Sequence, residues 1–262
     1  MSNSVALVTG GAQGLGQAIA LRLAQDGFDV AVDDVPGKSA ELEATSKEIE
    51  GLGRKSIFLT ADVTREANVK EMVEKTVATL GRLDVMVANA GIAPKAATNV
   101  AEVDISAWEA LWAVNIRGVV LCYKYAAQQM IKQGTGGRII GDLLFLVCLF
   151  IATYQSKGAS SLCGLKGFAG FADYCISKAA VRSLTQTTAL ELKDHNITVN
   201  AYAPGVINTP MSTSHGAYEA LRLADSRTGE ADDVAGLVSY LASPGARHVT
   251  GQTIAIDGGA LL

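Results

Sequence analysis

The sequence predicts an α/β fold in which a doubly wound parallel sheet forms a single domain. Three observations support this prediction. Short apolar runs alternate with amphipathic segments of helical period along the 262 residues, a glycine-rich turn follows the first run, and no Pro-, Ser- or Gly-rich linker divides the chain. Parallel strands need crossover helices, so this alternation implies a sheet covered by helices on both faces.

The predicted elements follow one another in regular order. Apolar runs predict strands, and apolar residues spaced by three or four predict helices. The expected strands cover residues 5–8, 29–32, 56–59, 85–88, 138–140, 198–201 and 253–256. The expected helices cover the stretch from the glycine turn to Gly27 and about residues 40–52, 66–80, 107–133, 174–193 and 232–242.

Composition excludes several classes of protein. An apolar fraction of 49% excludes intrinsic disorder, and a net charge of −4 without a basic run argues against binding to nucleic-acid phosphates. The four cysteines contain no Cys-x-x-Cys pair and the three histidines are scattered, so we expect no disulfide framework and no metal site. The N-terminus lacks the pattern of a signal peptide, so the expected location is the cytoplasm.

The turn after the first strand contains Gly10, Gly14 and Gly16. Glycine allows a tight turn and lets a pyrophosphate approach the helix N-terminus, where free N–H groups and the helix dipole favour negative charge. A tight turn without a ligand is the alternative interpretation. Because this is the first turn of a strand–helix series, the sequence favours a dinucleotide-binding Rossmann fold.

Two acids end the second strand, and Asp34 lies eighteen residues after Gly16. A carboxylate at this distance can accept hydrogen bonds from the adenosine ribose and would repel a 2′-phosphate. The nearest cation that could receive such a phosphate is Lys38. The expected cofactor is therefore NAD rather than NADP, and the alternative is that Asp33 and Asp34 are a solvated pair.

Tyr174 and Lys178 are four residues apart, so on a helix they share one face. A phenol has a pKa of about 10 and is a poor base near neutral pH. A nearby ammonium stabilises the phenolate and lowers that pKa, so the phenol can exchange a proton with an alcohol or a carbonyl. Tyr-x-x-x-Lys also occurs by chance, and an exposed pair without a role is the alternative.

The same motifs occur together in one protein family. In chain order they are Thr9-Gly-x-x-x-Gly-x-Gly16, Asp62-Val63, Asn89-Ala90-Gly91, Asn115, Ser161, Tyr174-x-x-x-Lys178, and Pro204-Gly205 with Thr209. In their order and spacing the chain resembles the short-chain dehydrogenase/reductase family over nearly its whole length. Residues 5–28, 181–187 and 250–259 are especially similar to diacetyl/acetoin reductases (2,3-butanediol dehydrogenases).

The resemblance implies a role for each matching residue. Tyr174 would be the general acid/base, Lys178 would lower its pKa and bind the nicotinamide ribose, and Ser161 would hydrogen-bond the substrate oxygen. Asn115 would hold a helix distortion and a water in a proton relay. Ser161 lies thirteen residues before Tyr174, as in the family, and the neighbouring Ser160 is the alternative hydroxyl.

The resemblance also implies a cofactor site. Asp62 and Val63 would contact adenine, and Ile207 with Thr209 would orient the carboxamide. The full implied set is Gly10, Gln13, Gly14, Leu15, Gly16, Asp34, Asp62, Val63, Asn89, Ala90, Gly91, Tyr174, Lys178, Pro204, Ile207 and Thr209. Two alternatives stay open, because Asp62 could instead cap the following helix and Asn115 could be an ordinary polar helix residue.

Two segments depart from the family pattern. Joining Gly141 to Ala159 would give a stretch that closely resembles the family, but residues 142–158 lie between them. Their apolar run, residues 143–152, is shorter than the roughly 20 residues of a membrane span. A gene-model artefact, a flap or oligomer contact, and a defect that leaves a weakly active protein are three open explanations. Residues 210–229 form a shorter substrate lid than is usual, so the substrate is the least predictable feature.

These inferences predict an NAD-dependent oxidoreductase that interconverts a secondary alcohol and a ketone, with acetoin, diacetyl and 2,3-butanediol as the expected substrates. The alternatives are a 3-oxoacyl-thioester reductase of the same family and a nucleotide-binding protein inactivated by residues 142–158. A membrane contact through residues 143–152 is disfavoured, because only Lys157 lies nearby as a basic flank. The expected partner is a small ketone or alcohol, with no nucleic acid and no membrane, and the resemblance implies a homotetramer.

Overall fold

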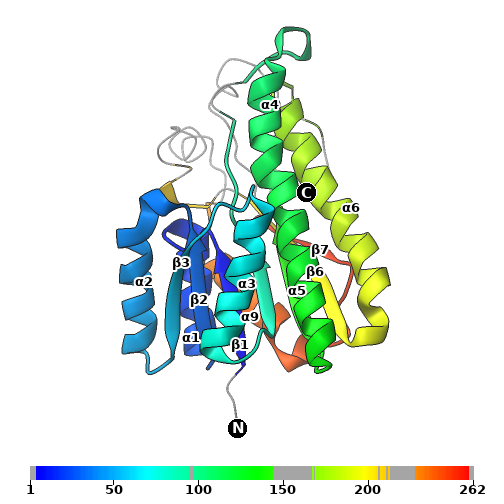
Figure 1. Cartoon of the computed structure of the whole chain (residues 1–262). Helices are drawn as coiled ribbons and strands as arrows, with labels where there is room; N and C mark the ends of the chain where they lie inside the picture. The colour runs from blue at the N-terminus through cyan, green and yellow to red at the C-terminus, as the bar shows by residue number, and fades with distance from the viewer. Residues whose placement is uncertain are drawn as a thin grey trace.

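The chain forms a seven-stranded parallel sheet in the computed structural model, with helices packed beside it (Figure 1). The structure describes residues 4–94, 97–143, 167, 169–205, 207–210, 212 and 228–259. The strands are β1 (Val5–Thr9), β2 (Asp29–Asp34), β3 (Ser56–Thr60), β4 (Val85–Ala88), β5 (Gly137–Asp142), β6 (Ile197–Pro204) and β7 (Thr253–Ile256). Their order across the sheet is β3-β2-β1-β4-β5-β6-β7, and each neighbouring pair is parallel.

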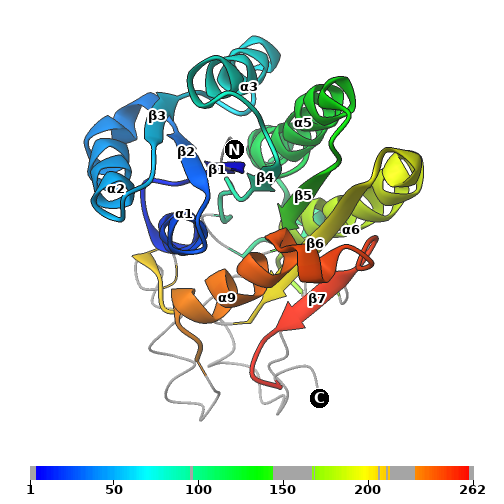
Figure 2. The same cartoon turned by 90° about the horizontal axis from the view of Figure 1, so that it is seen from below.

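Helices cover both faces of this sheet (Figure 2). One face carries α1 (Gly14–Gln25), α2 (Ser39–Gly51) and α9 (Ala231–Ala242), and the other carries α3 (Glu66–Leu80), α5 (Val119–Gln133) and α6 (Ala172–Leu192). The remaining helical segments are α4 (Ile105–Trp112), the π-helical η3 (Ala113–Gly118), and the short 3₁₀ turns η1 (Pro36–Lys38), η2 (Val100–Glu102), η5 (Lys193–His195) and η6 (Pro244–Ala246). Successive strand residues point to opposite faces, so each helical layer packs on its own apolar core.

The central strands have apolar sequences because both of their faces are covered. Every residue of β1, β4 and β6 is buried. Such near-continuous apolar runs are typical of parallel sheets. The apolar runs in the sequence therefore predicted these strands, although polar and apolar residues do not alternate in them.

The chain reverses its direction of travel across the sheet next to β1. From β1 it proceeds outward through β2 to β3, then returns to β4 on the other side of β1 and proceeds outward again to β7. At such a reversal the loops after the two adjacent strands diverge and leave a crevice at the carboxyl ends of the strands. The glycine turn after β1 lies at this point.

The predicted fold class is confirmed, and the element boundaries differ by a few residues. The helix at Glu66–Leu80 and the strands at Val85–Ala88 and Thr253–Ile256 lie where the pattern predicts them. The strand β5 continues to Asp142, two residues beyond the predicted end, and Leu143 N–H still donates to Tyr202 O at 2.8 Å. The first residue of the segment 142–158 is thus part of the sheet, and its residues 144–158 lie outside the described part of the chain.

The predicted helix over residues 107–133 is a continuous helical stretch, Ile105–Gln133, interrupted by the π-helical η3. By length and composition alone this stretch could cross a membrane, and 33% of its apolar 18-residue window is buried. In this fold its α5 half packs against the sheet through residues such as Val119, Ala126 and Met130. We therefore interpret it as a core helix.

Candidate active site

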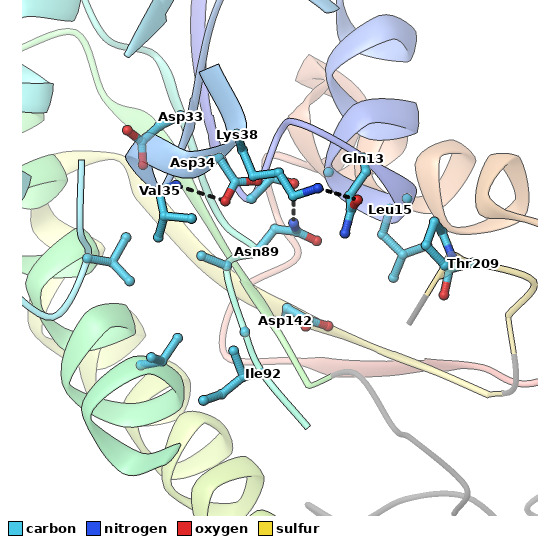
Figure 3. Close-up of a pocket in the computed structure, with 18 of the residues that line it drawn as sticks. Gln13, Leu15, Asp33, Asp34, Val35, Lys38, Asn89, Ile92, Asp142 and Thr209 are labelled. Atoms are coloured by element: carbon cyan, nitrogen blue, oxygen red, sulfur yellow. Dashed lines mark hydrogen bonds between the residues drawn. The ribbon is translucent and has the colours of Figure 1, made fainter. Parts of the chain in front are cut away.

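A pocket of about 350 Å³ lies at the carboxyl ends of the strands around the point of reversal (Figure 3). The predicted site residues that line it are Gly10, Gln13, Gly14, Leu15, Gly16, Asp34, Asp62, Val63, Asn89, Ala90, Gly91, Tyr174, Lys178 and Thr209. The lining residues that were not predicted are Asp33, Val35, Lys38, Ala61, Ile92, Val114, Asp142 and Pro210. Residues from widely separated parts of the sequence thus meet in one cavity.

The glycine turn needs glycine at specific positions. Gly10 and Gly14 have φ values of 69° and 58°, a region that side chains disfavour. A Cβ at Gly16 would overlap the Gly10 carbonyl oxygen and lie 2.6 Å from Asn89 Nδ2. The following helix α1 has no side-chain cap at Gln13 and no acidic residue in its first turn. Its N–H groups are therefore open to an anion, so this cradle fits a pyrophosphate.

Asn89 braces the turn from the end of β4. Its backbone N–H donates to Thr9 Oγ1 at 3.1 Å, and its side-chain Nδ2 donates to Thr9 O at 2.8 Å. Its Oδ1 accepts a hydrogen bond from the buried Tyr202 hydroxyl at 2.9 Å. These hydrogen bonds of Asn89 thus hold the shape of the pocket wall.

The two acids at the end of β2 have different surroundings. The partly exposed Asp34 accepts hydrogen bonds from Val35 N at 2.9 Å and Ala12 N at 3.3 Å, and it faces the pocket mouth. Asp33 is fully buried, and its Oδ1 accepts a hydrogen bond from Ala61 N at 2.8 Å. Burial raises the pKa of Asp33 well above the usual value. The interpretation of the two residues as a solvated pair is therefore wrong.

Lys38 lies on the pocket wall beside Asp34. Its Nζ donates to Glu41 Oε1 at 2.9 Å and to Gln13 Oε1 at 3.2 Å, and Figure 3 shows its side chain directed toward Gln13. The hydrogen bond from Lys38 lowers the pKa of Glu41. The mouth of the pocket therefore carries a carboxylate suited to ribose hydroxyls and an ammonium that already has two partners.

Asp62 lies in the turn before α3, where the sequence left a helix cap open as an alternative role. Its Oδ1 accepts hydrogen bonds from Thr64 N at 2.9 Å and Thr64 Oγ1 at 2.7 Å. Partial burial opposes its charge, but the Thr64 hydrogen bonds and the ion pair with Arg65 hold the pKa of Asp62 below its usual value. Arg65, not Asp62, occupies the cap position of α3. Asp62 therefore shapes the turn before the helix and lines the pocket at the same time.

Tyr174 and Lys178 lie on one face of α6 and point into the pocket. Both are buried, with 2% and 3% of their surface exposed, so the interpretation as an exposed pair is wrong. Lys178 Nζ lies 5.3 Å from the centre of the Tyr174 ring. An ammonium at this distance in a desolvated site favours the phenolate form of a tyrosine. The pair can therefore donate or accept a proton.

Lys178 has a second neighbour that sequence reasoning missed. Its Nζ donates to the Asp142 backbone carbonyl at 3.3 Å and forms an ion pair with Asp142 Oδ2 at 3.4 Å. Both side chains are almost completely buried. The available signal was that Asp142 lies two residues after a predicted strand, because the carboxyl ends of parallel strands meet at one edge of the sheet.

Asn115 lies in the π-helical segment η3, so the predicted helix distortion is present. Its Oδ1 accepts a hydrogen bond from Ile92 N, and its Nδ2 donates to Ile92 O, both at 2.9 Å. A Cβ at Gly91 would lie 3.5 Å from Asn115 Oδ1 and 3.9 Å from Lys178 Nζ. Asn115 thus lies behind the pocket wall, next to the lysine.

The structure does not bring every predicted residue into the pocket. Ser161 and its alternative Ser160 lie outside the described residues. Pro204 is the buried last residue of β6 and does not line the cavity. Ile207 pairs with Gly229 and lines a separate cavity of about 330 Å³. Of the residues implied for the carboxamide, Thr209 alone lines the main pocket.

A search of the described residues for metal ligands finds no group of three or more His, Cys, Asp or Glu residues that could hold an ion. His195 and His248 are exposed on the surface, away from the pocket lining. The described pocket lining offers the phenol of Tyr174, the ammonium groups of Lys38 and Lys178, carboxylates, side-chain amides, the Thr209 hydroxyl and backbone groups.

Two family models match the chain. A model described as short chain dehydrogenase matches residues 4–141, and one described as enoyl-(acyl carrier protein) reductase matches residues 157–260. This chain belongs to the short-chain dehydrogenase family. The two matches leave only residues 142–156 between them, inside the segment that departs from the family pattern.

Relatives of known description align over nearly the whole chain. A short-chain dehydrogenase/reductase of Hericium erinaceus is 42% identical over 99% of this chain and 98% of its own length. An L-2,3-butanediol dehydrogenase of Corynebacterium glutamicum is 36% identical over 99% of both chains. A 3-oxoacyl-[acyl-carrier-protein] reductase of Staphylococcus epidermidis is 35% identical over 98% of both chains.

Solved structures share the fold. The acetoin dehydrogenase YohF from Salmonella typhimurium superposes with a TM-score of 0.81 at 31% identity, over 99% of this chain and 96% of the other. A short chain dehydrogenase from Burkholderia cenocepacia, solved in complex with NADP, gives 0.84 at 33% identity over 99% and 98%. The chain is an oxidoreductase of alcohol and ketone substrates in a family that uses NAD(P).

Proposed function

We propose that this enzyme reduces small ketones such as diacetyl and acetoin with NADH, and oxidises the corresponding alcohols, including 2,3-butanediol. The observation that carries the proposal is the buried Tyr174–Lys178 pair, with Lys178 Nζ 5.3 Å from the tyrosine ring, on the wall of the pocket that contains the glycine turn. A proton donor and a dinucleotide cradle that share one cavity are what carbonyl reduction requires.

The cofactor would extend along the pocket from β2 to α6. The open N–H groups of α1 would hold the pyrophosphate, Asp34 the adenosine ribose, and Asp62 with Val63 the adenine. Tyr174 and Lys178 would face the nicotinamide ribose. Thr209 would orient the carboxamide from the pocket wall, with the Ile207 backbone behind it. When bound, the nicotinamide supplies the hydride that reaches the carbonyl carbon.

We propose NAD rather than NADP because of the charges at the pocket mouth. The Asp34 carboxylate suits the two hydroxyls of an adenosine ribose and repels a 2′-phosphate. Lys38 is the nearby cation, but its ammonium already donates to Gln13 and Glu41. A phosphate would have to displace these bonds while it lies beside a carboxylate.

The residues of the chain would move one proton. In the direction of reduction, the Tyr174 hydroxyl donates its proton to the carbonyl oxygen, and in oxidation the phenolate takes the proton from the alcohol. Lys178 stabilises the phenolate. Ser161 would hydrogen-bond the same substrate oxygen, and Asn115 would hold the relay water beside Lys178.

The substrate class rests on the relatives and has one close competitor. The butanediol dehydrogenase and the acetoin dehydrogenase favour a small ketone. The 3-oxoacyl-[acyl-carrier-protein] reductase has nearly the same identity to this chain as the butanediol dehydrogenase. A bulky acyl thioester is therefore the second candidate substrate.

The test is NADH oxidation over a panel that contains diacetyl, acetoin and a 3-oxoacyl thioester. It is run on the full chain and on a version without residues 144–158, which keeps Asp142 and Leu143 in the sheet, because the second version separates the effect of this segment from the choice of substrate. We expect turnover of the small diketone and hydroxyketone in at least one version. Turnover of the thioester alone would favour the competitor, and no turnover by either folded version would contradict the proposal.

We further propose that the enzyme is a cytoplasmic homo-oligomer, in accordance with the family resemblance. Neighbouring helices α5 and α6 expose aliphatic side chains to solvent, namely Val120, Ile131, Ile176 and Leu190. Exposed apolar residues on adjacent helices are suited to contact between copies. Light scattering of the purified chain measures the assembly, and a monomer at micromolar concentration would contradict this part of the proposal.

A further inference from the structure

A carboxylate lies inside the candidate active site where the proposed chemistry does not use one. Asp142 is the last residue of β5, pairs with Tyr202 of β6, and is 3% exposed. Its Oδ2 lies 3.4 Å from Lys178 Nζ, and its backbone carbonyl lies 3.3 Å from the same atom. An ammonium has three N–H donors, and Asp142 thus engages two of those of Lys178.

Within the part of the chain that the structure describes, titratable groups around Asp142 lie on α5, α6 and β6. Lys178 pairs with it from α6 and lies beside Tyr174, and Tyr123 of α5 and Tyr202 of β6 lie within reach of its charge. Burial is the main cause that raises the pKa values of Tyr123 and Tyr202. The negative charge of Asp142 makes a smaller contribution in the same direction. The field of the carboxylate therefore reaches the tyrosine hydroxyls on the neighbouring elements.

The same field acts on the proposed proton donor. A lysine favours the ionised form of an adjacent phenol because it supplies a positive charge in a site with little water. A carboxylate at 3.4 Å from that ammonium turns the lysine into one half of an ion pair. The phenol then faces an ion pair in place of a lone positive charge, so its ionisation is stabilised less by the lysine.

We propose that Asp142 is a positioning residue that fixes Lys178 at the end of β5 and offsets its charge, so that Tyr174 releases its proton at a higher pH than it would beside an unpaired lysine. The inference rests on the roles proposed above for Tyr174 and Lys178. It implies that alcohol oxidation requires a more alkaline pH in this enzyme than in a version without the carboxylate.

The deciding variant is Asp142→Asn, which removes the charge and keeps the shape of the side chain. Its matched control is Asp29→Asn. Asp29 is also buried in an ion pair, with Arg54 at 2.7 Å, but it lies at the start of β2, at the opposite end of the sheet. Both variants remove one half of a buried ion pair, and Asp142→Asn alone changes the charge beside Lys178.

The primary measurement is an ultraviolet titration of tyrosinate in the full-length protein without cofactor. The difference between each protein and its Tyr174→Phe version isolates the titration of Tyr174. We expect Asp142→Asn to move this titration to lower pH by about one unit or more, since a lost like charge shifts a buried group by this amount. We expect Asp29→Asn to leave it in place. The pH profile of alcohol oxidation should move in the same direction as the titration.

A Tyr174 titration that stays in place or moves to higher pH in Asp142→Asn would overturn the inference. Asp142→Ala is the second variant if the asparagine version does not fold, and the same outcomes apply to it. Failure of the proposed function is a separate result. If Tyr174→Phe keeps full ketone turnover, the proposed function fails, while the titration still reports on Asp142. If the wild type reduces the ketone and the Tyr174 titration does not move in Asp142→Asn, only the role of Asp142 is wrong.

Discussion

The two walls of the pocket are built in different ways. The wall beside β1 and β2 consists largely of backbone, because the glycine turn exposes N–H groups at the start of α1 and close approach leaves no room for a Cβ at Gly16. The wall beside β5 and α6 consists of the buried side chains of Asp142, Tyr174 and Lys178. Asp142 and Lys178 are in contact although they are 36 positions apart in the sequence. The first wall is suited to holding a cofactor and the second to moving a proton.

This difference predicts that the two walls respond to different kinds of change. On the β1–β2 wall, added bulk at a glycine should reduce affinity for the dinucleotide. On the β5–α6 wall, loss of the Asp142 charge or of the Tyr174 hydroxyl should alter the rate or its pH dependence with little change in dinucleotide affinity. The predictions below test this separation.

The largest expected effect on the β1–β2 wall is that of Gly16→Ala. The new methyl group would overlap the Gly10 carbonyl, so the turn has to shift and the N–H groups of α1 lose their alignment. We expect NADH affinity to fall by about 100-fold or more, since several charged hydrogen bonds are lost together. Isothermal titration calorimetry measures it.

Gly51→Ala is the control for the added methyl group. Gly51 is the last residue of α2, and a Cβ there would meet no atom within 4 Å. Alanine favours a helix over glycine by about 1 kcal/mol or less, so this variant should keep wild-type NADH affinity and gain slightly in thermal stability. Equal affinities of the Gly16 variant and the wild type would contradict a backbone cradle.

A smaller effect is expected for Asp34→Ser at the pocket mouth. Loss of the carboxylate removes charged hydrogen bonds to the ribose, and we expect NADH affinity to fall by about 10-fold, with a gain in relative affinity for NADPH. Lys38→Ala is the comparison, because its ammonium already donates to Gln13 and Glu41. If the lysine variant loses NADH affinity and the serine variant does not, the assignment of the ribose to Asp34 is wrong.

The smallest expected effect concerns stability and Asp33. Its native pKa is raised by burial, so the folded protein binds a proton more tightly than the unfolded chain. Ionisation of Asp33 therefore costs stability as the pH rises above the unfolded value of about 4. Asp33→Asn removes this cost, so its thermal midpoint should rise relative to wild type between about pH 4 and pH 7.

Asp62→Asn should show the opposite trend. The native pKa of Asp62 is lowered, so its carboxylate contributes stability above the unfolded pKa and loses that contribution as the pH falls through the folded one. Thermal melts measure the two signs, for Asp33→Asn between about pH 4 and pH 7 and for Asp62→Asn below about pH 4. A constant difference between Asp33→Asn and wild type at all pH values would show that burial does not shift the Asp33 titration.

The same contrast explains what the sequence could predict. Gly10, Gly14 and Gly16 belong to a local motif whose geometry depends on a few consecutive residues, so their place in the pocket followed from spacing. Tyr174 and Lys178 share a helix face for the same reason. In each case the relevant neighbours are close in sequence.

The residues that sequence reasoning missed depend on contacts between distant segments. Asp142 was assigned to a segment outside the family pattern, and its contact with Lys178 exists only because β5 ends opposite α6. The different environments of Asp33 and Asp34 likewise depend on which face of β2 each side chain takes. Spacing alone does not contain either fact.

The central claim is that Tyr174 is the proton donor of a ketone reductase, and its most direct test is the Tyr174→Phe variant. Ketone turnover with NADH and NADH affinity are measured on the same sample, so a loss of cofactor binding cannot be mistaken for a loss of chemistry. The account predicts a loss of turnover by about 10²- to 10⁴-fold, the usual contribution of a positioned general acid, with unchanged NADH affinity. A phenylalanine variant that reduces the ketone at the wild-type rate would contradict it.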